Sequence, residues 1–312
     1  MITLQFVYVV TGIVFAAFAL LSARDRSNAK RFGNAAFWGL LAVSFLAGNQ
    51  LGDFWNGILV LLLVAIAGLG ALGRGKPRTT TTDERRAEAD RHGNRLFWLA
   101  LIIPATALIG TLLFKRLPAF FESRQVTLIS LTMGVLLALA VAAAWLRPRP
   151  LVPLEEGRRL MDAVGWAAVL PQMLASLGAV FALAGVGDVI GEFARDVIPA
   201  GSLLGAVVAY GVGMALFTMI MGNAFAAFPV MAAAIGVPLL IQGYGGNPAV
   251  VCAIGMLAGF CGTLMTPMAA NFNIVPAALL ELRDRNGVIR AQILTALPLL
   301  AVNIALIYFL AW

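Results

Sequence analysis

Polar side chains that could bind a small ion collect at two points in an otherwise apolar stretch of the sequence. Between Val197 and Leu280 there is no Asp, Glu, Lys, Arg or His. The first point is the segment MGNAFAAFP, which holds Gly222 and Asn223. The second is the segment CGTLMTPMAANFNIVP, whose polar and helix-breaking candidates are Gly262, Thr263, Thr266, Pro267, Asn271 and Asn273. Hydroxyls, carboxamides and backbone groups can hold an ion or a polar ligand without an ionised side chain.

Helix interruptions of this kind have a particular meaning in a bilayer. Every backbone N–H and C=O in hydrocarbon needs a partner, so broken helices persist only where they are buried in protein or line a wet cavity. Paired interruptions in long apolar segments are typical of a transporter's binding site. We therefore predict a re-entrant helical hairpin over 201–241, with its tip at Gly222–Asn223, and a broken helix over 249–280.

The composition indicates a membrane protein. Of the 312 residues, 61% are hydrophobic and 12% are charged, and the mean hydropathy is +0.92. Soluble domains contain about 25% charged residues. We expect an all-α polytopic integral membrane protein with about 8–10 transmembrane helices, surrounded by the lipid bilayer. The net charge of +7 does not indicate a nucleic-acid partner, because the basic residues lie in short loops between apolar runs.

The residue types needed for catalysis are scarce. The sequence holds one histidine, His92, and two cysteines, Cys252 and Cys261, both in apolar segments. No metal-ligand cluster, Ser–His–Asp set or Cys–His set can be recognised. We expect no enzymatic activity, no resident metal and no cofactor, although a transporter of this type could use Na⁺ as a coupling ion.

The apolar runs divide the chain into three regions. Region 1–146 is expected to hold five spans and a polar cytoplasmic loop over 73–95. Segment 147–162 contains three prolines and is predicted to be a stiff, extended cytoplasmic linker. Region 163–312 is expected to hold a span near 163–187, the hairpin, the broken helix and a last span that ends at Trp312.

The distribution of Lys and Arg predicts the orientation. Most of the 22 basic residues fall in four segments: 22–34, 73–95, 147–159 and 283–290. The positive-inside rule then places both termini outside. Lys115, Arg116 and Arg124 lie on the unexpected side. Charge does not separate the hairpin from three ordinary spans over 201–265, and we prefer the hairpin because 249–280 is too long for one unbroken crossing.

Three segments carry a resemblance to a known family: MGNAFAAFP, GFCGTLMTPMAANFNIVPAALLEL (259–282) and SARDRSNAKRFGNAAFWG (22–39). The chain resembles the larger membrane subunit of a proposed two-subunit bacterial 5-oxoproline (pyroglutamate) transporter. That family is grouped with the ion-transporter superfamily of anion carriers.

The resemblance implies a half-transporter in the bacterial inner membrane that works with a smaller membrane subunit and carries a small carboxylate. In the superfamily, a hairpin tip and a broken helix face substrate and coupling ion. By position these correspond here to Gly222–Asn223 and to the group Gly262, Thr263, Thr266, Pro267, Asn271 and Asn273. Carriers of the superfamily normally hold two such sets, whereas this chain holds one.

Two readings of the polar breaks follow. In a transporter subunit, helix N-termini and neutral Asn and Thr groups would meet the carboxylate and an oxygen-preferring Na⁺ ion. In an accessory subunit that stabilises a partner without binding substrate, the same side chains would only form hydrogen bonds between helices.

Overall fold

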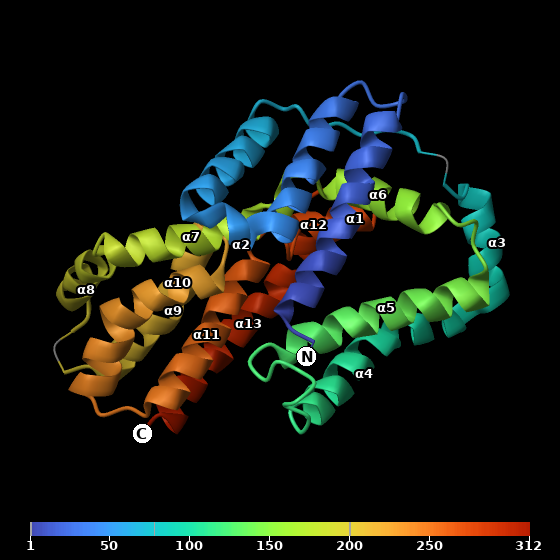
Figure 1. Cartoon of the computed structure of the whole chain (residues 1–312). Coiled ribbons are helices and arrows are strands. Elements are labelled where there is room, and N and C mark those ends of the chain that lie inside the picture. Colours follow the sequence, from blue (N-terminus) through green and yellow to red (C-terminus); the bar gives the residue numbers. More distant parts are fainter. Residues whose placement is uncertain (1, 78, 200) are drawn as a thin grey trace. The chain divides into compact units, whose positions relative to one another are not determined.

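The computed structural model describes residues 2–77, 79–199 and 201–312, and every regular element in these ranges is a helix (Figure 1). This confirms the all-α class. The chain divides into two compact units, Met1–Gly165 and Trp166–Trp312, called unit 1 and unit 2 below.

Seven helices within the described residues are long and apolar enough to cross a bilayer. They are Leu4–Arg24, Arg31–Gly68, Asp83–Phe114, Val126–Leu146, Leu203–Met221, Ala224–Gly243 and Gly287–Leu310. This number lies below the expected range for three reasons. Arg31–Gly68 counts once although it folds back on itself, and the apolar helix Pro248–Leu264 has only 17 residues. In the run expected as a span near 163–187, the α-helix Leu170–Leu183 has only 14 residues.

Unit 1 is built from two packed helix pairs. Its elements are α1 (Leu4–Arg24), α2 (Arg31–Gly68), α3 (Thr82–His92), η1 (Gly93–Leu96), α4 (Phe97–Phe114), α5 (Val126–Leu146) and α6 (Val152–Val164). α1 packs along α2, and α4 packs along α5. The aromatic rings of Phe15 and Trp38 stack between α1 and α2, with ring centroids 5.6 Å apart.

Helix α2 is a hairpin with a break at Gly52. This glycine has φ 72° and ψ 171°, a conformation that essentially only glycine adopts. A straight helix would separate Asn34 from Gly73 by roughly 50 Å or more, yet the Asn34 Nδ2 atom donates to the Gly73 carbonyl at 2.8 Å. The second and third of the five spans expected in region 1–146, the apolar runs at 35–47 and 56–72, are therefore mainly the two arms of one folded-back helix.

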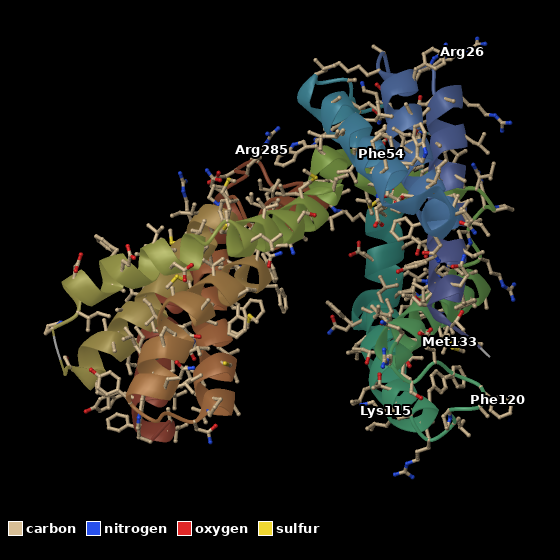
Figure 2. The ribbon with its side chains drawn as sticks, turned by 60° about the vertical axis from the view of Figure 1, so that its left-hand side comes forward. Arg26, Phe54, Lys115, Phe120, Met133 and Arg285 are labelled. Atoms are coloured by element: carbon tan, nitrogen blue, oxygen red, sulfur yellow. The ribbon has the colours of Figure 1, made fainter. Side chains whose placement is uncertain are left out.

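At one end of unit 1, the N-terminal residues contact the loop between α4 and α5. The Ile2 amide donates to the Phe120 carbonyl at 2.6 Å, and the Leu4 amide donates to the Glu122 carboxylate at 2.9 Å. Figure 2 shows Lys115 and Phe120 at this end and Arg26 at the opposite end. The N-terminal residues and 115–124 thus lie at the same end of unit 1, and the side of the membrane that they face stays a prediction.

The segment 147–162 differs from the extended linker that we expected. Arg147 has a left-handed conformation, with φ 46° and ψ 51°, and residues 150–151 form a turn. Val152–Val164 then forms helix α6, with Pro153 in its first turn. Proline is tolerated there because the N–H that it lacks would have no partner within the helix. α6 packs on α1 and belongs to unit 1.

Unit 2 surrounds a core of buried apolar side chains that includes Tyr210, Met214, Leu240, Val251 and Ile307. Its elements are η2 (Gly165–Ala168), α7 (Leu170–Leu183), α8 (Val186–Val197), α9 (Leu203–Met221), α10 (Ala224–Met231), η3 (Ala232–Gly243), α11 (Pro248–Leu264), α12 (Ile274–Leu279) and α13 (Gly287–Leu310). η3 is wound as a π-helix and continues α10. α11 packs against both α9 and α13.

The run expected as one span near 163–187 holds the short helices η2 and α7 instead. Helix α8 follows α7 after Gly185, which has a left-handed φ of 69°. α7 packs on α10 and α8 packs on η3. Small residues permit this close approach: a Cβ at Gly191 would lie 2.9 Å from the Ala234 carbonyl.

The hairpin over 201–241 consists of α9 and of α10 with η3. α9 has 19 residues and rises roughly 28 Å, close to the ~30 Å thickness of a hydrocarbon core. Both arms have the length of complete spans. The alternative of ordinary spans therefore fits these helices as well as the re-entrant hairpin does.

Candidate functional site

The tip of the hairpin is the dipeptide Gly222–Asn223. α9 ends at Gly222, whose φ of 73° lies in the left-handed region that favours glycine. The Asn223 side-chain oxygen accepts a hydrogen bond from the Phe225 amide at 2.8 Å and caps α10. Glycine as a C-terminal stop and asparagine as an N-cap reverse the chain within two residues.

The break in the second apolar segment lies between α11 and α12, over residues 265–273. The Asn273 Nδ2 atom donates to the carbonyls of Thr263 at 2.8 Å and Thr266 at 2.6 Å. The last carbonyls of a helix have no partner within it. Asn273 therefore closes the end of α11, while the Thr263 hydroxyl donates to the Phe260 carbonyl of its own helix at 2.6 Å.

The hairpin tip and the helix break lie against each other. The Thr266 hydroxyl donates to the Met219 carbonyl, near the end of α9, at 2.9 Å. The Met268 carbonyl lies so close to Gly222 that a Cβ there would collide with it. Gly262 is similarly close to the backbone of Ala215. The two glycines thus allow direct contact between segments 46–47 residues apart in sequence.

The predicted site residues differ in exposure. Gly222, Gly262, Thr263, Thr266 and Asn273 are buried, Asn223 is half-buried, and Pro267 and Asn271 are exposed. The structure thus brings the buried members together through backbone contacts and the Asn273 and Thr266 side chains. Pro267 and Asn271 lie in the same break but face outward.

Two buried oxygens at this junction have no hydrogen-bond partner among the described residues. They are the side-chain oxygen of Asn273 and the hydroxyl of Thr218, and both residues are fully buried. An unpaired buried polar atom carries a desolvation cost, so such atoms often meet a bound ion, water or ligand. Thr218 was not among the sequence candidates because it lies inside a regular helix.

A second polar residue missed from the sequence is Asn303, in the middle of α13. It is 4% exposed, and its Nδ2 atom donates to the Cys261 sulfur at 3.4 Å. Its only sequence signal was a carboxamide within the apolar run that we assigned to a plain last span.

Unit 1 contains a buried charged network at the end marked by Arg26. The Arg158 guanidinium is 2.9 Å from both the Asp25 and the Glu155 carboxylates and 3.5 Å from Asp162. The side-chain oxygen of Asp162 also accepts hydrogen bonds from Asn34 and from the indole N–H of Trp38, each at 2.8 Å. These contacts connect α6 to α2 and to the turn after α1.

The pKa values of Asp25 and Asp162 are shifted in opposite directions. Burial opposes ionisation of Asp25, but hydrogen bonds from Ser27 and Arg158 outweigh it and hold its pKa below the usual value. Burial dominates at Asp162 and raises its pKa, against the hydrogen bonds from Trp38 and Asn34. Because every charge here has a partner within unit 1, we interpret the network as structural.

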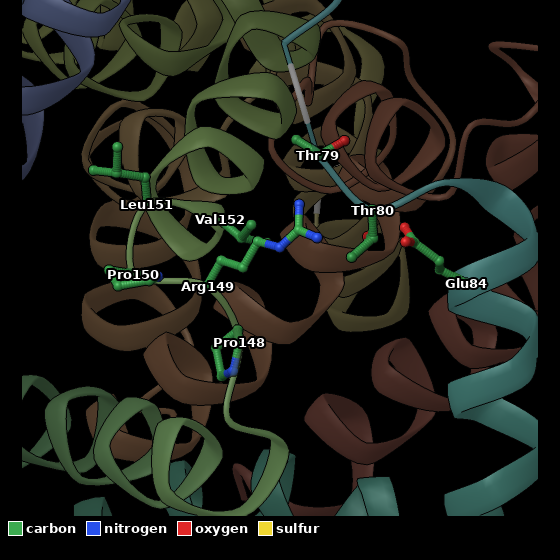
Figure 3. Close-up of a pocket in the computed structure, with 8 residues that line it drawn as sticks. All are labelled: Thr79, Thr80, Glu84, Pro148, Arg149, Pro150, Leu151 and Val152. Atoms are coloured by element: carbon green, nitrogen blue, oxygen red, sulfur yellow. The ribbon is translucent and has the colours of Figure 1, made fainter.

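Unit 1 also has a groove of about 500 Å³ between the 148–152 segment and the residues before α3. Figure 3 shows the Arg149 side chain extending toward Thr79 and Thr80, with Glu84 beyond them. The Glu84 carboxylate accepts the Thr81 amide at 2.8 Å as part of a capping box. Arg149 and Glu84 are exposed, so this groove lacks the buried polar groups found at the hairpin tip and the break.

The helices define a multi-pass membrane protein whose most elaborate polar junction joins a hairpin tip to a helix break. A family model described as "Protein of unknown function (DUF979)" matches residues 5–312, and the chain belongs to this DUF979 family. A search of curated proteins found no match, and a search of solved structures found none either.

Proposed function

We propose that the chain is a membrane subunit of a secondary transporter for a small organic anion, 5-oxoproline, and that it works with a second, smaller membrane subunit. The observation that carries the proposal is the contact between the Gly222–Asn223 tip and the 265–273 break, at which the buried Asn273 oxygen has no partner. A junction of this type provides polar groups for a ligand inside an apolar protein.

The substrate and the partner rest on the sequence resemblance in segments 22–39 and 222–282. Among the described residues, one polar junction joins a hairpin tip to a helix break. Transporters of this type place their site between two repeats, which supports the need for a second subunit. The resemblance implies the bacterial inner membrane, and the positive-inside rule predicts that both termini are outside.

The coupling ion is proposed to be Na⁺. Proton-coupled carriers generally use an ionisable side chain within the membrane, and the sequence has none between Val197 and Leu280. Na⁺ prefers oxygen ligands, and the Asn273 and Thr218 oxygens are buried without a partner. No enzymatic step and no other cofactor belong to this proposal.

The test is uptake of labelled 5-oxoproline into vesicles that contain this chain alone, its genomic neighbour alone, or both. We expect uptake only with both subunits and only with a Na⁺ gradient. Uptake by this chain alone would remove the need for a partner. Uptake that is indifferent to Na⁺ and lost in Asp188→Asn would refute Na⁺ coupling.

The alternative is an accessory subunit that stabilises its partner without binding substrate. One observation favours it: the side chains of Asn273 and Thr266 donate their hydrogen bonds to backbone carbonyls that would otherwise be unpaired. This reading expects substitutions at the break to lower the stability of the complex and to leave substrate affinity unchanged.

A further inference from the structure

A cavity lies beside the helix break in unit 2. It has a volume of about 290 Å³, and its walls are leucine side chains of α11 and α13 together with Phe260 and Phe272. The rings of these two phenylalanines lie 6.4 Å apart and are strongly inclined to each other. Such walls suit a small ring rather than a polar chain.

The lining of this cavity includes a buried carboxamide, the side chain of Asn303. It lines the cavity from α13, is 4% exposed, and has one hydrogen bond among the described residues, to the Cys261 sulfur at 3.4 Å. A carboxamide offers two donors and an acceptor, and a thiol is a weak acceptor. Most of the hydrogen-bonding capacity of this buried group is therefore unused.

The residues that line the cavity favour some classes of ligand over others. A lipid acyl chain would cover the apolar walls but leave the Asn303 carboxamide unpaired, which is costly in a buried site. A charged group would find no counter-charge, because no lining residue is ionised. A small ring with a neutral amide on its edge satisfies both parts, since the amide can exchange hydrogen bonds with the carboxamide.

We propose that this cavity binds the ring of the transported molecule and that the Asn303 carboxamide forms hydrogen bonds with an amide on the edge of that ring. The inference rests on the proposed function, because 5-oxoproline is a five-membered lactam with one carboxylate. Its lactam would pair with Asn303, and its ring would lie against Phe260 and Phe272. The carboxylate would be left for the adjoining break, which shares Thr263 with the cavity.

The first test compares two ligands of similar size in the purified two-subunit complex. Cyclopentanecarboxylate has the ring and the carboxylate of 5-oxoproline but lacks the lactam. We expect the wild type to prefer 5-oxoproline, and Asn303→Leu to weaken 5-oxoproline binding about tenfold with little effect on cyclopentanecarboxylate. Thr295→Val, an exposed change on the same helix, is the matched control and should keep the preference.

The outcomes separate this inference from the proposed function. If the complex binds and transports 5-oxoproline but Asn303→Leu keeps the wild-type preference, the cavity assignment is wrong and the transporter function stands. If the wild-type complex neither binds nor transports 5-oxoproline, the proposed function falls and this inference falls with it.

A second measurement does not depend on how Asn303→Leu folds. The chain has two cysteines, and Cys252→Ala with Cys261→Ala removes both. Leu257→Cys then introduces one thiol at an exposed residue of the cavity lining. Saturating 5-oxoproline should slow its reaction with a small methanethiosulfonate at least tenfold, as followed by mass spectrometry of the peptide that contains it. Protection by a fatty acid, with none by 5-oxoproline, would overturn the inference and identify a lipid site.

Discussion

The two units use polar groups in opposite ways. In unit 1, Arg158 is enclosed by three carboxylates, and the network ties α6 to α2 and to the turn after α1. In unit 2, the junction of tip and break contains only neutral groups, and two of its buried oxygens have no partner. Buried side-chain atoms without a hydrogen bond occur among the described residues of both units, including the hydroxyls of Ser22 and Ser130 in unit 1. The difference lies in charge: a paired cation is buried in unit 1, whereas the proposed site in unit 2 rests on neutral groups.

The largest expected effect is in unit 1. Arg158→Met would leave buried carboxylates without their partner and should cost about 3–5 kcal/mol of stability. Thermal unfolding in detergent, followed by tryptophan fluorescence, measures this loss. Arg91→Met is the control, because Arg91 is exposed and pairs only with exposed Glu88, and it should cost at most about 1 kcal/mol. Similar melting temperatures for the two variants would contradict the structural role of the network.

The next largest effect is expected from Asn273 and not from Asn271, although both lie in the 265–273 break. Asn273→Ala removes the donor to the Thr263 and Thr266 carbonyls and should cost about 1–3 kcal/mol of stability. It should also weaken 5-oxoproline binding in the complex. Asn271→Ala changes an exposed side chain and should leave stability nearly unchanged. If Asn273→Ala lowers only the melting temperature, the accessory reading gains support.

The effect at the hairpin tip is smaller. Asn223→Ala removes the cap of α10 and should cost about 1 kcal/mol. Serine also caps helices, so Asn223→Ser should restore most of the melting temperature. Binding then distinguishes the roles: an affinity loss that persists in the serine variant assigns the carboxamide to the ligand, and full recovery assigns it to capping alone.

The smallest effect is a pH dependence within the charged network. The pKa of Asp25 is lowered in the folded chain, so its contribution to stability is present above about pH 4 and is lost as pH falls through the lowered pKa. The pKa of Asp162 is raised, so its contribution is largest below pH 4 and is lost as pH rises through the raised pKa. Acidification should therefore lower the melting temperature more steeply in Asp162→Asn than in Asp25→Asn, by about 3 °C at most. Equal slopes in a series of melting curves would refute this assignment.

The sequence was informative where local chemistry decides the structure. The Gly222–Asn223 reversal and the break after Leu264 follow from glycine, asparagine and proline in apolar surroundings, and both are found. Thr218 and Asn303 could not be identified in this way, because they lie inside regular helices and only packing reveals their burial.

Tertiary contacts explain the remaining differences. Arg158 and Asp162 were assigned to an extended linker because prolines precede them, yet Val152–Val164 is a helix that packs on α1. Its charged face has partners in Asp25, Asn34 and Trp38, more than a hundred residues earlier in the chain. A local sequence pattern cannot predict contacts between residues this far apart in the chain.

The break at Gly52 in α2 has a consequence for the surrounding lipid. Its second arm, from Asp53 to Gly68, rises roughly 24 Å and is shorter than the ~30 Å hydrocarbon core of an average bilayer. A short span can be accommodated by local thinning of the bilayer, and the exposed Asp53 at its end is a polar group that favours contact with headgroups and water. The mismatch between this short arm of α2 and the hydrocarbon thickness would favour membranes whose lipids have short acyl chains. Such lipids would then be enriched around this part of unit 1.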